Sequence, residues 1–149
     1  MQPHTVDGVT LPVPEGWEVS EDVPDTVLAA VEPRREGRFA ANTVVTLDVL
    51  GDETLVGWAQ RQVAMLTERV PRLRVLDLED VALDGWAARR VLAHYPLRGH
   101  GGVTLEQWLV PDGQRGVVLS CSAAALEYDR LADLFVEVAA GLRVSTEAR

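Results

Sequence analysis

The chain contains no lysine and no isoleucine, and all fourteen of its basic residues are arginine. We interpret this bias as the codon usage of a GC-rich, actinobacterial genome. The arginines are outnumbered by 23 acidic residues, which gives a formal net charge of −9. Nucleic acids and anionic membranes attract clustered positive charge. The composition therefore predicts that neither is a partner of this protein.

Cysteine is almost absent, since Cys121 is the only one in the chain. A single cysteine excludes an internal disulfide and a zinc site built on cysteines. Cys121 could act as a nucleophile activated by a histidine. Its alternation with Val117 and Leu119 in an expected strand favours the other interpretation, a buried thiol that behaves as a small hydrophobic residue.

Long apolar runs are also missing. No segment approaches the roughly 20 apolar residues that a membrane-spanning helix needs, and the sequence predicts no membrane association. The first residues, 1–14, lack the basic region and apolar run of a signal peptide. We therefore expect a cytoplasmic protein.

The length of 149 residues suits one domain, which we expect to span 1–149. Residues 1–20 read as an N-terminal β arm, because Pro12 and Pro14 restrict this segment to an edge or an extended arm. Residues 144–149 are expected to form a frayed tail.

A β-hairpin is predicted at Asp84-Gly85, because a type I′ turn needs positive φ at both central residues. A two-residue turn there places Glu79 opposite Arg90 and Asp80 opposite Arg89. The more apolar face, which we assign to the core, carries Leu76, Leu78, Val91, Ala93 and Tyr95. The mixed face carries Val75, Asp77, Glu79, Arg90 and His94, and in this register Leu76 lies opposite Ala93 and Val75 opposite His94.

The rest of the chain alternates between strand and helix patterns. Strands are expected at 27–33, 41–50, 103–110 and 117–124, and amphipathic helices at 53–70 and 127–142. Asp52 is the expected N-cap of the first helix, and Pro71 ends it. This order predicts an α+β fold with an antiparallel sheet of about six to seven strands. We expect both main helices on one face of that sheet, with the other face partly open or covered by the N-terminal arm.

Several segments resemble one known family: LPVPEGW at 11–17, RFAANTVVTLDVL at 38–50, DGWAARRVLAHY at 84–95, VTLEQWLV at 103–110 and ALEYDRLADLF at 125–135. They are similar to LpqN-type proteins, which are grouped with PsbP-like, DcrB-like and Mog-type proteins and with adaptor chaperones of type VI secretion effectors. The resemblance implies a PsbP-like sandwich and a binding or adaptor role without shared catalytic residues. This chain departs from the lipoprotein members because it lacks a signal sequence and a lipobox cysteine.

Catalytic and binding motifs are sparse. His94 could be oriented by Asp77 as a general base, or it could be a surface histidine beside a carboxylate. The serines at 120 and 122 lie outside any G-x-S-x-G motif, and the glycine-rich segment 99–102 reads as a flexible loop. The arginines at 34, 35 and 38 favour a solvated turn, with a docking point for an acidic peptide as the alternative.

The predicted interaction surface is the sheet face turned away from the helices. Tryptophan is enriched at the energetic centres of interfaces. The alternative is that Trp17 and the other rings form a second small core under the N-terminal arm. The candidate interaction residues are Thr46, Trp86, Glu106, Trp108, Ser120 and Ser122.

We therefore predict a non-catalytic binding or adaptor domain that engages a protein partner or a second copy of itself. The sequence indicates no enzyme activity, no cofactor and no metal. The alternative is a module for a small hydrophobic ligand or lipid, with a pocket between the sheet and the helices.

Overall fold

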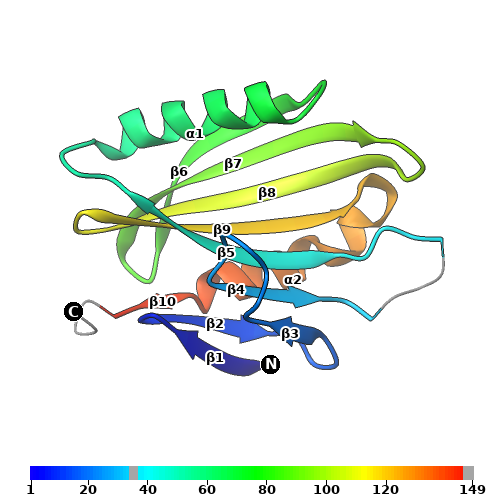
Figure 1. Ribbon diagram of the computed structural model, residues 1–149, viewed down its shortest axis with the longest axis horizontal. Coiled ribbons are helices and arrows are strands. Elements are labelled where there is room, and N and C mark those ends of the chain that lie inside the picture. Colours follow the sequence, from blue (N-terminus) through cyan, green and yellow to red (C-terminus); the bar gives the residue numbers. More distant parts are fainter. Residues whose placement is uncertain (34–36, 146–149) are drawn as a thin grey trace.

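The computed structural model describes residues 1–33 and 37–145, which form two antiparallel sheets and two helices (Figure 1). The larger sheet has the strand order β3 (Glu18–Ser20), β4 (Leu28–Val31), β5 (Asn42–Val49), β9 (Arg115–Ala124), β8 (Gly101–Asp112), β7 (Trp86–Leu97) and β6 (Arg74–Leu83). The smaller sheet has the order β1 (Gln2–Val6), β2 (Val9–Val13) and β10 (Arg143–Val144). The helices are α1 (Leu55–Arg69) and α2 (Tyr128–Ala140), the latter preceded by a 3-10 turn at Ala125–Glu127. The predicted α+β class is confirmed.

Residues 2–13 of the predicted N-terminal arm form a hairpin of the smaller sheet, whereas β3, at the end of that arm, belongs to the larger sheet. The turn of this hairpin, Asp7-Gly8, has positive φ at both residues, as a type I′ turn requires. The C-terminal strand β10 pairs with β2, so that Val144 lies opposite Val9. Val144 is thus a strand residue rather than part of the predicted tail. Residues 146–149 of that tail, and Arg34 and Arg35 of the predicted basic cluster, lie outside the described residues.

The predicted β6–β7 hairpin is present, with φ of 51° at Asp84 and 79° at Gly85. Its register places Glu79 opposite Arg90 and Asp80 opposite Arg89, as predicted. Beyond Asp77 the prediction is wrong, because the register shifts by one residue between Val75 and Asp77. Val75 lies opposite Ala93 and Arg74 opposite His94, where the sequence pattern placed Leu76 and Val75. The extra residue of this bulge leaves Leu76 exposed.

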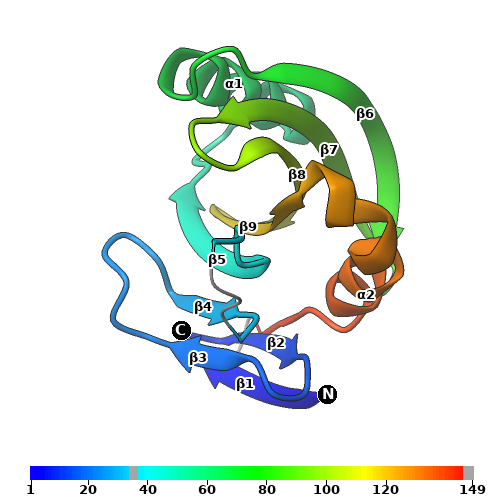
Figure 2. The ribbon, with the colours of Figure 1, turned by 90° about the vertical axis from the view of Figure 1, so that its right-hand side faces the viewer.

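The two helices pack on opposite faces of the larger sheet (Figure 2), so the prediction that both cover one face is wrong. On the face that we call the α1 face, Trp58 and Ala59 pack in one core with residues of β7, β8 and β9, namely Val91, Leu109 and Val118. On the other, the α2 face, Phe135 and Val138 pack with Trp108 and Leu119. Strand β2 completes the second layer with Val9 and Leu11.

The apolar face predicted for the hairpin divides between core and surface. Val91 and Ala93 are buried, as predicted. Leu76 and Leu78, on β6, are exposed, because β6 is the outermost strand and α1 packs against β7. The pattern identified the residues that share a face, but the edge position of β6 decides which of them are covered.

Helix α1 begins two residues later than predicted. The N-cap is Thr54, whose Oγ1 accepts a hydrogen bond of 3.0 Å from the Gly57 N–H. Asp52, the predicted cap, lies in the preceding turn and is exposed. The helix ends at Arg69, two residues before Pro71, as expected for a helix that a proline follows.

Trp58 packs directly over Gly116 of β9, and this contact yields a testable prediction. A Cβ at position 116 would lie 2.5 Å from Cζ2 and 2.7 Å from Cη2 of the Trp58 ring. We expect Gly116→Ala to lower the free energy of unfolding by about 1–3 kcal/mol, because the buried ring has to shift. Urea denaturation of both proteins measures the difference.

A second variant shows whether contact with the Trp58 ring causes the destabilisation of Gly116→Ala. Trp58→Phe removes the six-membered part of the indole, which carries both clashing atoms. The cost of Gly116→Ala should therefore be smaller in the Trp58→Phe background than in the parent protein. Equal costs in the two backgrounds would contradict the assigned clash.

Candidate interaction site

A row of side chains crosses one end of the larger sheet on the α2 face. Val49 of β5 lies opposite Arg115 of β9, and Arg115 lies opposite Asp112 of β8. Trp86 and Leu83, which are paired with each other on β7 and β6, line one hollow together with Asp112. We call Val49, Arg115, Asp112, Trp86 and Leu83 the end row. Three strand ends and two strand starts therefore converge on a single edge of the molecule.

An ion pair occupies the middle of the end row. The Asp112 carboxylate is buried, and Arg115 donates to its Oδ2 from Nη2 at 2.8 Å and from Nε at 3.2 Å. The Arg115 Nη1 also donates to the backbone carbonyl of Asp7 at 2.8 Å. A buried carboxylate is tolerated when it is paired and hydrogen-bonded in this way. One guanidinium thus ties the end of the larger sheet to the turn of the β1–β2 hairpin.

Two hollows flank this ion pair and share Asp112 as a lining residue. The first has a volume of about 590 Å³ and is lined by Leu47, Asp48, Val49, Asp112, Gln114, Arg115 and Ser145. The second, of about 50 Å³, is lined by Leu83, Asp84, Trp86, Val110, Pro111, Asp112, Leu142, Arg143 and Val144. Arg143 Nε lies 3.3 Å from Asp84 Oδ2, which joins the tip of the β6–β7 hairpin to β10.

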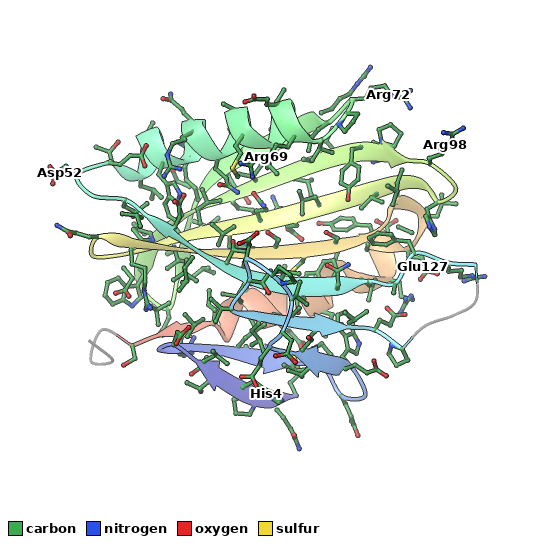
Figure 3. The ribbon with its side chains drawn as sticks, in the orientation of Figure 1. His4, Asp52, Arg69, Arg72, Arg98 and Glu127 are labelled. Carbon is green, nitrogen blue, oxygen red and sulfur yellow. The ribbon has the colours of Figure 1, made fainter. Side chains whose placement is uncertain are left out.

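The rim of the site is apolar and open to solvent. Val49 is 80% exposed, Trp86 52% and Leu47 37%. Asp52 marks the same end of the molecule in Figure 3, whereas Arg98 and Glu127 lie at the opposite end. Exposed apolar residues around a fixed polar centre suit the contact surface of another molecule.

The structure does not bring the six predicted interaction residues onto one face. Trp86 alone of the six belongs to the end row. Glu106 and Trp108 are buried on the α2 face, and Thr46, Ser120 and Ser122 lie on the α1 face. The assumption of a free sheet face is wrong because α1 covers one face and α2 with the smaller sheet covers the other. Trp108 and Trp17 instead pack in the α2-side core, as the alternative of a second small core predicted.

Ser120 takes part in a polar chain under α1. Gln107 donates to Ser120 Oγ at 2.9 Å and accepts from Gln62 Nε2 at 3.4 Å. Gln62 projects from α1, and both glutamines are buried. These bonds satisfy polar groups between the helix and the sheet, so we assign Ser120 a structural role.

Glu106 is the centre of a buried ionic cluster on the other face. Its carboxylate accepts hydrogen bonds from Arg90 Nε and, at 3.0 Å, from the Tyr128 hydroxyl. Arg90 also donates to Glu79 at 3.2 Å. Burial, together with the charge of Glu106, raises the pKa of Tyr128 to about 12. The cluster joins β6, β7 and β8 to the first turn of α2.

Cys121 is buried opposite Glu106, which confirms the predicted core thiol. Burial, followed by the negative charge of Glu106, raises the pKa of the thiol well above its usual value. A thiol that stays protonated is a poor nucleophile.

The predicted pair of His94 and Asp77 is engaged elsewhere. The His94 ring packs so closely on Gly102 that a Cβ there would lie 2.3 Å from Cε1. The Asp77 carboxylate accepts from the Leu78 N–H at 2.9 Å and lies 3.6 Å from Arg90 Nη1. The Asp77 carboxylate therefore contacts groups other than the imidazole that it was predicted to orient.

Sequence reasoning missed the end row, although one signal pointed to it. In an up-and-down run of strands, alternate turns lie at the same end of the sheet. The turns at Asp84-Gly85 and Gly113-Gln114 are two connections apart, so the residues beside both of them had to meet at one end. Trp86 and Asp112 are those residues.

The hydroxyl of Tyr128 gives a prediction for stability. Tyr128→Phe removes one donor to Glu106 and should lower the free energy of unfolding by about 1 kcal/mol at neutral pH. Tyr128 has a raised pKa in the folded state, so its stabilising contribution is complete below pH 10.0 and is lost as the pH rises towards about 12. The variant should lose less stability than the parent protein over that interval, as measured by chemical denaturation at several pH values.

Tyr95→Phe is a matched control for this prediction. Burial also raises the pKa of Tyr95, so this variant too should soften the loss of stability at high pH. The hydroxyl of Tyr95 is not one of the two donors to Glu106. An equal loss of stability at neutral pH in both variants would show that the missing bond to Glu106 does not cause the destabilisation of Tyr128→Phe.

Comparison with known proteins gives likenesses of structure. No protein-family model and no curated protein matches the sequence. The solution structure of PsbP from the cyanobacterium Synechocystis is 16% identical with a TM-score of 0.72, over 97% of this chain and 92% of that one. LpqN, involved in cell envelope biogenesis of Mycobacterium tuberculosis, is 19% identical with a TM-score of 0.68, over 92% and 83%. The Saccharomyces cerevisiae Ran-binding protein Mog1p is 21% identical with a TM-score of 0.67, over 95% and 93%.

These likenesses correct the predicted location. With PsbP and an LpqN involved in cell envelope biogenesis among the similar structures, a cytoplasmic location is not favoured, and that prediction is wrong. Among the described residues, no helix is long and apolar enough to cross a membrane. The actinobacterial origin inferred from composition stays a prediction.

At identities of 16% to 21% the likeness shows the fold alone. The chain has the PsbP-like, Mog-type fold that the sequence resemblance implied.

Proposed function

We propose that this chain is a non-catalytic binding domain that engages a protein partner through the end row and the neighbouring Leu47. The observation that carries the proposal is the exposure of Val49, Trp86 and Leu47 around the ion pair of Arg115 with the buried Asp112. A protein partner is also in keeping with the fold, because a similar structure, Mog1p, is a Ran-binding protein.

The free energies of burial and of association favour a contact that extends beyond these three side chains. Full burial of one such side chain contributes about 1.5–3 kcal/mol. Association costs about 4–15 kcal/mol in lost translational and rotational freedom. Three partly exposed apolar side chains therefore do not suffice for a stable complex, and hydrogen bonds to the partner have to contribute as well.

The alternative of a ligand pocket between the sheet and the helices has less support. Trp58 and Phe135 are fully buried in the two layers where such a pocket would lie. The hollow of about 590 Å³ lies instead at the end of the sheet.

Photo-crosslinking tests the proposed surface. A benzophenone amino acid at position 49, in the protein expressed in its native cells, should give an adduct of one defined mass. The matched control is position 56, because Val56 is also an exposed valine but projects from α1. Trp86→Ala should reduce the adduct at position 49 by about tenfold or more, as expected for the loss of an interface anchor.

The adduct is quantified by immunoblot and identified by mass spectrometry. Equal adducts from positions 49 and 56 would contradict the proposal, as would an adduct that Trp86→Ala leaves unchanged. Circular dichroism of the Trp86→Ala variant shows whether a loss reflects unfolding, which we do not expect because that side chain is half exposed.

A further inference from the structure

Strand β5 has one open edge at the candidate site. Strand β9 pairs with β5 over its whole length, from Asn42 to Val49. Strand β4 pairs with β5 only from Asn42 to Val45. Of the strands in the described residues, only β9 therefore pairs with the segment Thr46–Val49.

The backbone of this segment directs polar groups towards the open edge. The carbonyls of Ala41 and Val45 accept hydrogen bonds of 2.9 Å from the β4 side, whereas the N–H of Leu50 donates to Gln114 on the β9 side. Alternate residues of a strand direct their backbone groups to the same side. The N–H and C=O of Leu47 and the C=O of Val49 therefore face the open edge, and Asp48 Oδ1 accepts from the N–H of Val49 at 2.8 Å.

The other edges of the larger sheet are protected against strand addition. The outer strand β6 carries Asp77, Glu79 and Asp80 and contains a bulge. Charged residues and bulges on an edge strand discourage pairing with another chain. Strand β3, at the opposite edge, has three residues. The open part of β5 exposes Leu47 and Val49, as β6 exposes Leu76 and Leu78, but its pairing with β9 has no bulge.

We propose that the open edge of β5, Thr46–Val49, binds an extended segment of a partner protein as an additional β-strand. This inference rests on the proposed function and specifies how the partner binds. Main-chain hydrogen bonds would supply affinity, and alternate side chains of the added strand would enter the hollow lined by Leu47 and Val49. Strand addition thereby provides the hydrogen bonds to the partner that the apolar side chains of the rim cannot form.

A second copy of the chain does not fit this edge. In antiparallel pairing, residues that face each other share one side of the sheet. Self-pairing centred on Asp48 places two carboxylates directly opposite each other, which is destabilising. Self-pairing centred on Leu47 brings Val49 opposite Val45, and Val45 is already paired with Leu28 of β4.

Charge indicates what the added segment carries. Asp48 and Glu53 share a single arginine, Arg61, at 3.0 and 2.8 Å, which leaves this cluster one negative charge in excess. Asp52 is exposed in the adjacent turn, and the whole chain has a net charge of −9. We therefore assign the partner segment alternating apolar residues together with arginine or lysine.

The test uses the synthetic peptide Arg-Val-Thr-Val-Thr-Val-Arg and amide hydrogen exchange measured by NMR. At millimolar peptide, exchange of the Leu47 amide should slow by about tenfold or more, because strand pairing protects it. Two modified peptides carry N-methyl groups, one on its valines and the other on its threonines. One of them should lose the protection and the other should keep it, because only alternate amides of an added strand face β5.

Protein variants provide the controls. Leu47→Lys and Val49→Lys should abolish the protection, whereas Val136→Lys, at an exposed valine on α2, should preserve it. A peptide with glutamate in place of both arginines should protect at least about tenfold less at equal concentration. No protection of the Leu47 amide by the parent peptide, or equal protection by both N-methylated peptides, would overturn strand addition.

Failure of strand addition can be distinguished from failure of the proposed function. If position 49 crosslinks to a partner while the Leu47 amide stays unprotected, the surface binds a partner without adding a strand. If position 49 gives no specific adduct and the amide stays unprotected, both proposals are wrong.

Discussion

Burial of strand β8 on both faces is the constraint on which the rest of the structure depends. Every residue from Val103 to Val110 is buried, because α1 packs on one side and α2 with the smaller sheet on the other. Polar side chains on such a strand have to find partners within the protein. Glu106 bonds to Arg90 and Tyr128, and Gln107 bonds to Gln62 and Ser120. The same polar residues therefore hold both helices to the sheet, and the surfaces left for a partner are its ends and edges.

Much of the fold followed from local signals in the sequence. The Asp84-Gly85 turn predicted the hairpin and its register as far as Asp77, because φ and side-chain alternation are local properties. The bulge at Leu76 had no such signal. Alternation also shows which residues share a face but not what covers that face. The consecutive apolar residues Val117, Val118 and Leu119 indicate burial on both sides, a sign that was available in the sequence.

The candidate site was harder to predict because its residues come from distant parts of the chain. Asp112 and Arg115 flank one turn, but Val49 meets them only through the pairing of β5 with β9, which no sequence spacing encodes. Trp86 was identified because tryptophan is enriched at interfaces and its place in the alternation put it on the face turned away from the helices. Glu106 and Trp108 were assigned to the surface because they fall on the face that was expected to be turned away from the helices, although both lie inside.

The end row has a rigid centre, and the open edge of β5 lies beside that centre. This combination favours binding. Arg115 bonds to Asp112 of the larger sheet and to the Asp7 carbonyl in the β1–β2 turn, so these two charged side chains, which line the main hollow, are held in place before a partner arrives. A fixed surface loses less conformational freedom on association than a flexible one. Beside it, Leu47 retains backbone groups that β4 does not reach. Elsewhere the larger sheet protects its edges with charge, a bulge or short length. The open segment of β5 is therefore a local exception. Its position beside a preformed hollow is the reason to assign it a binding role.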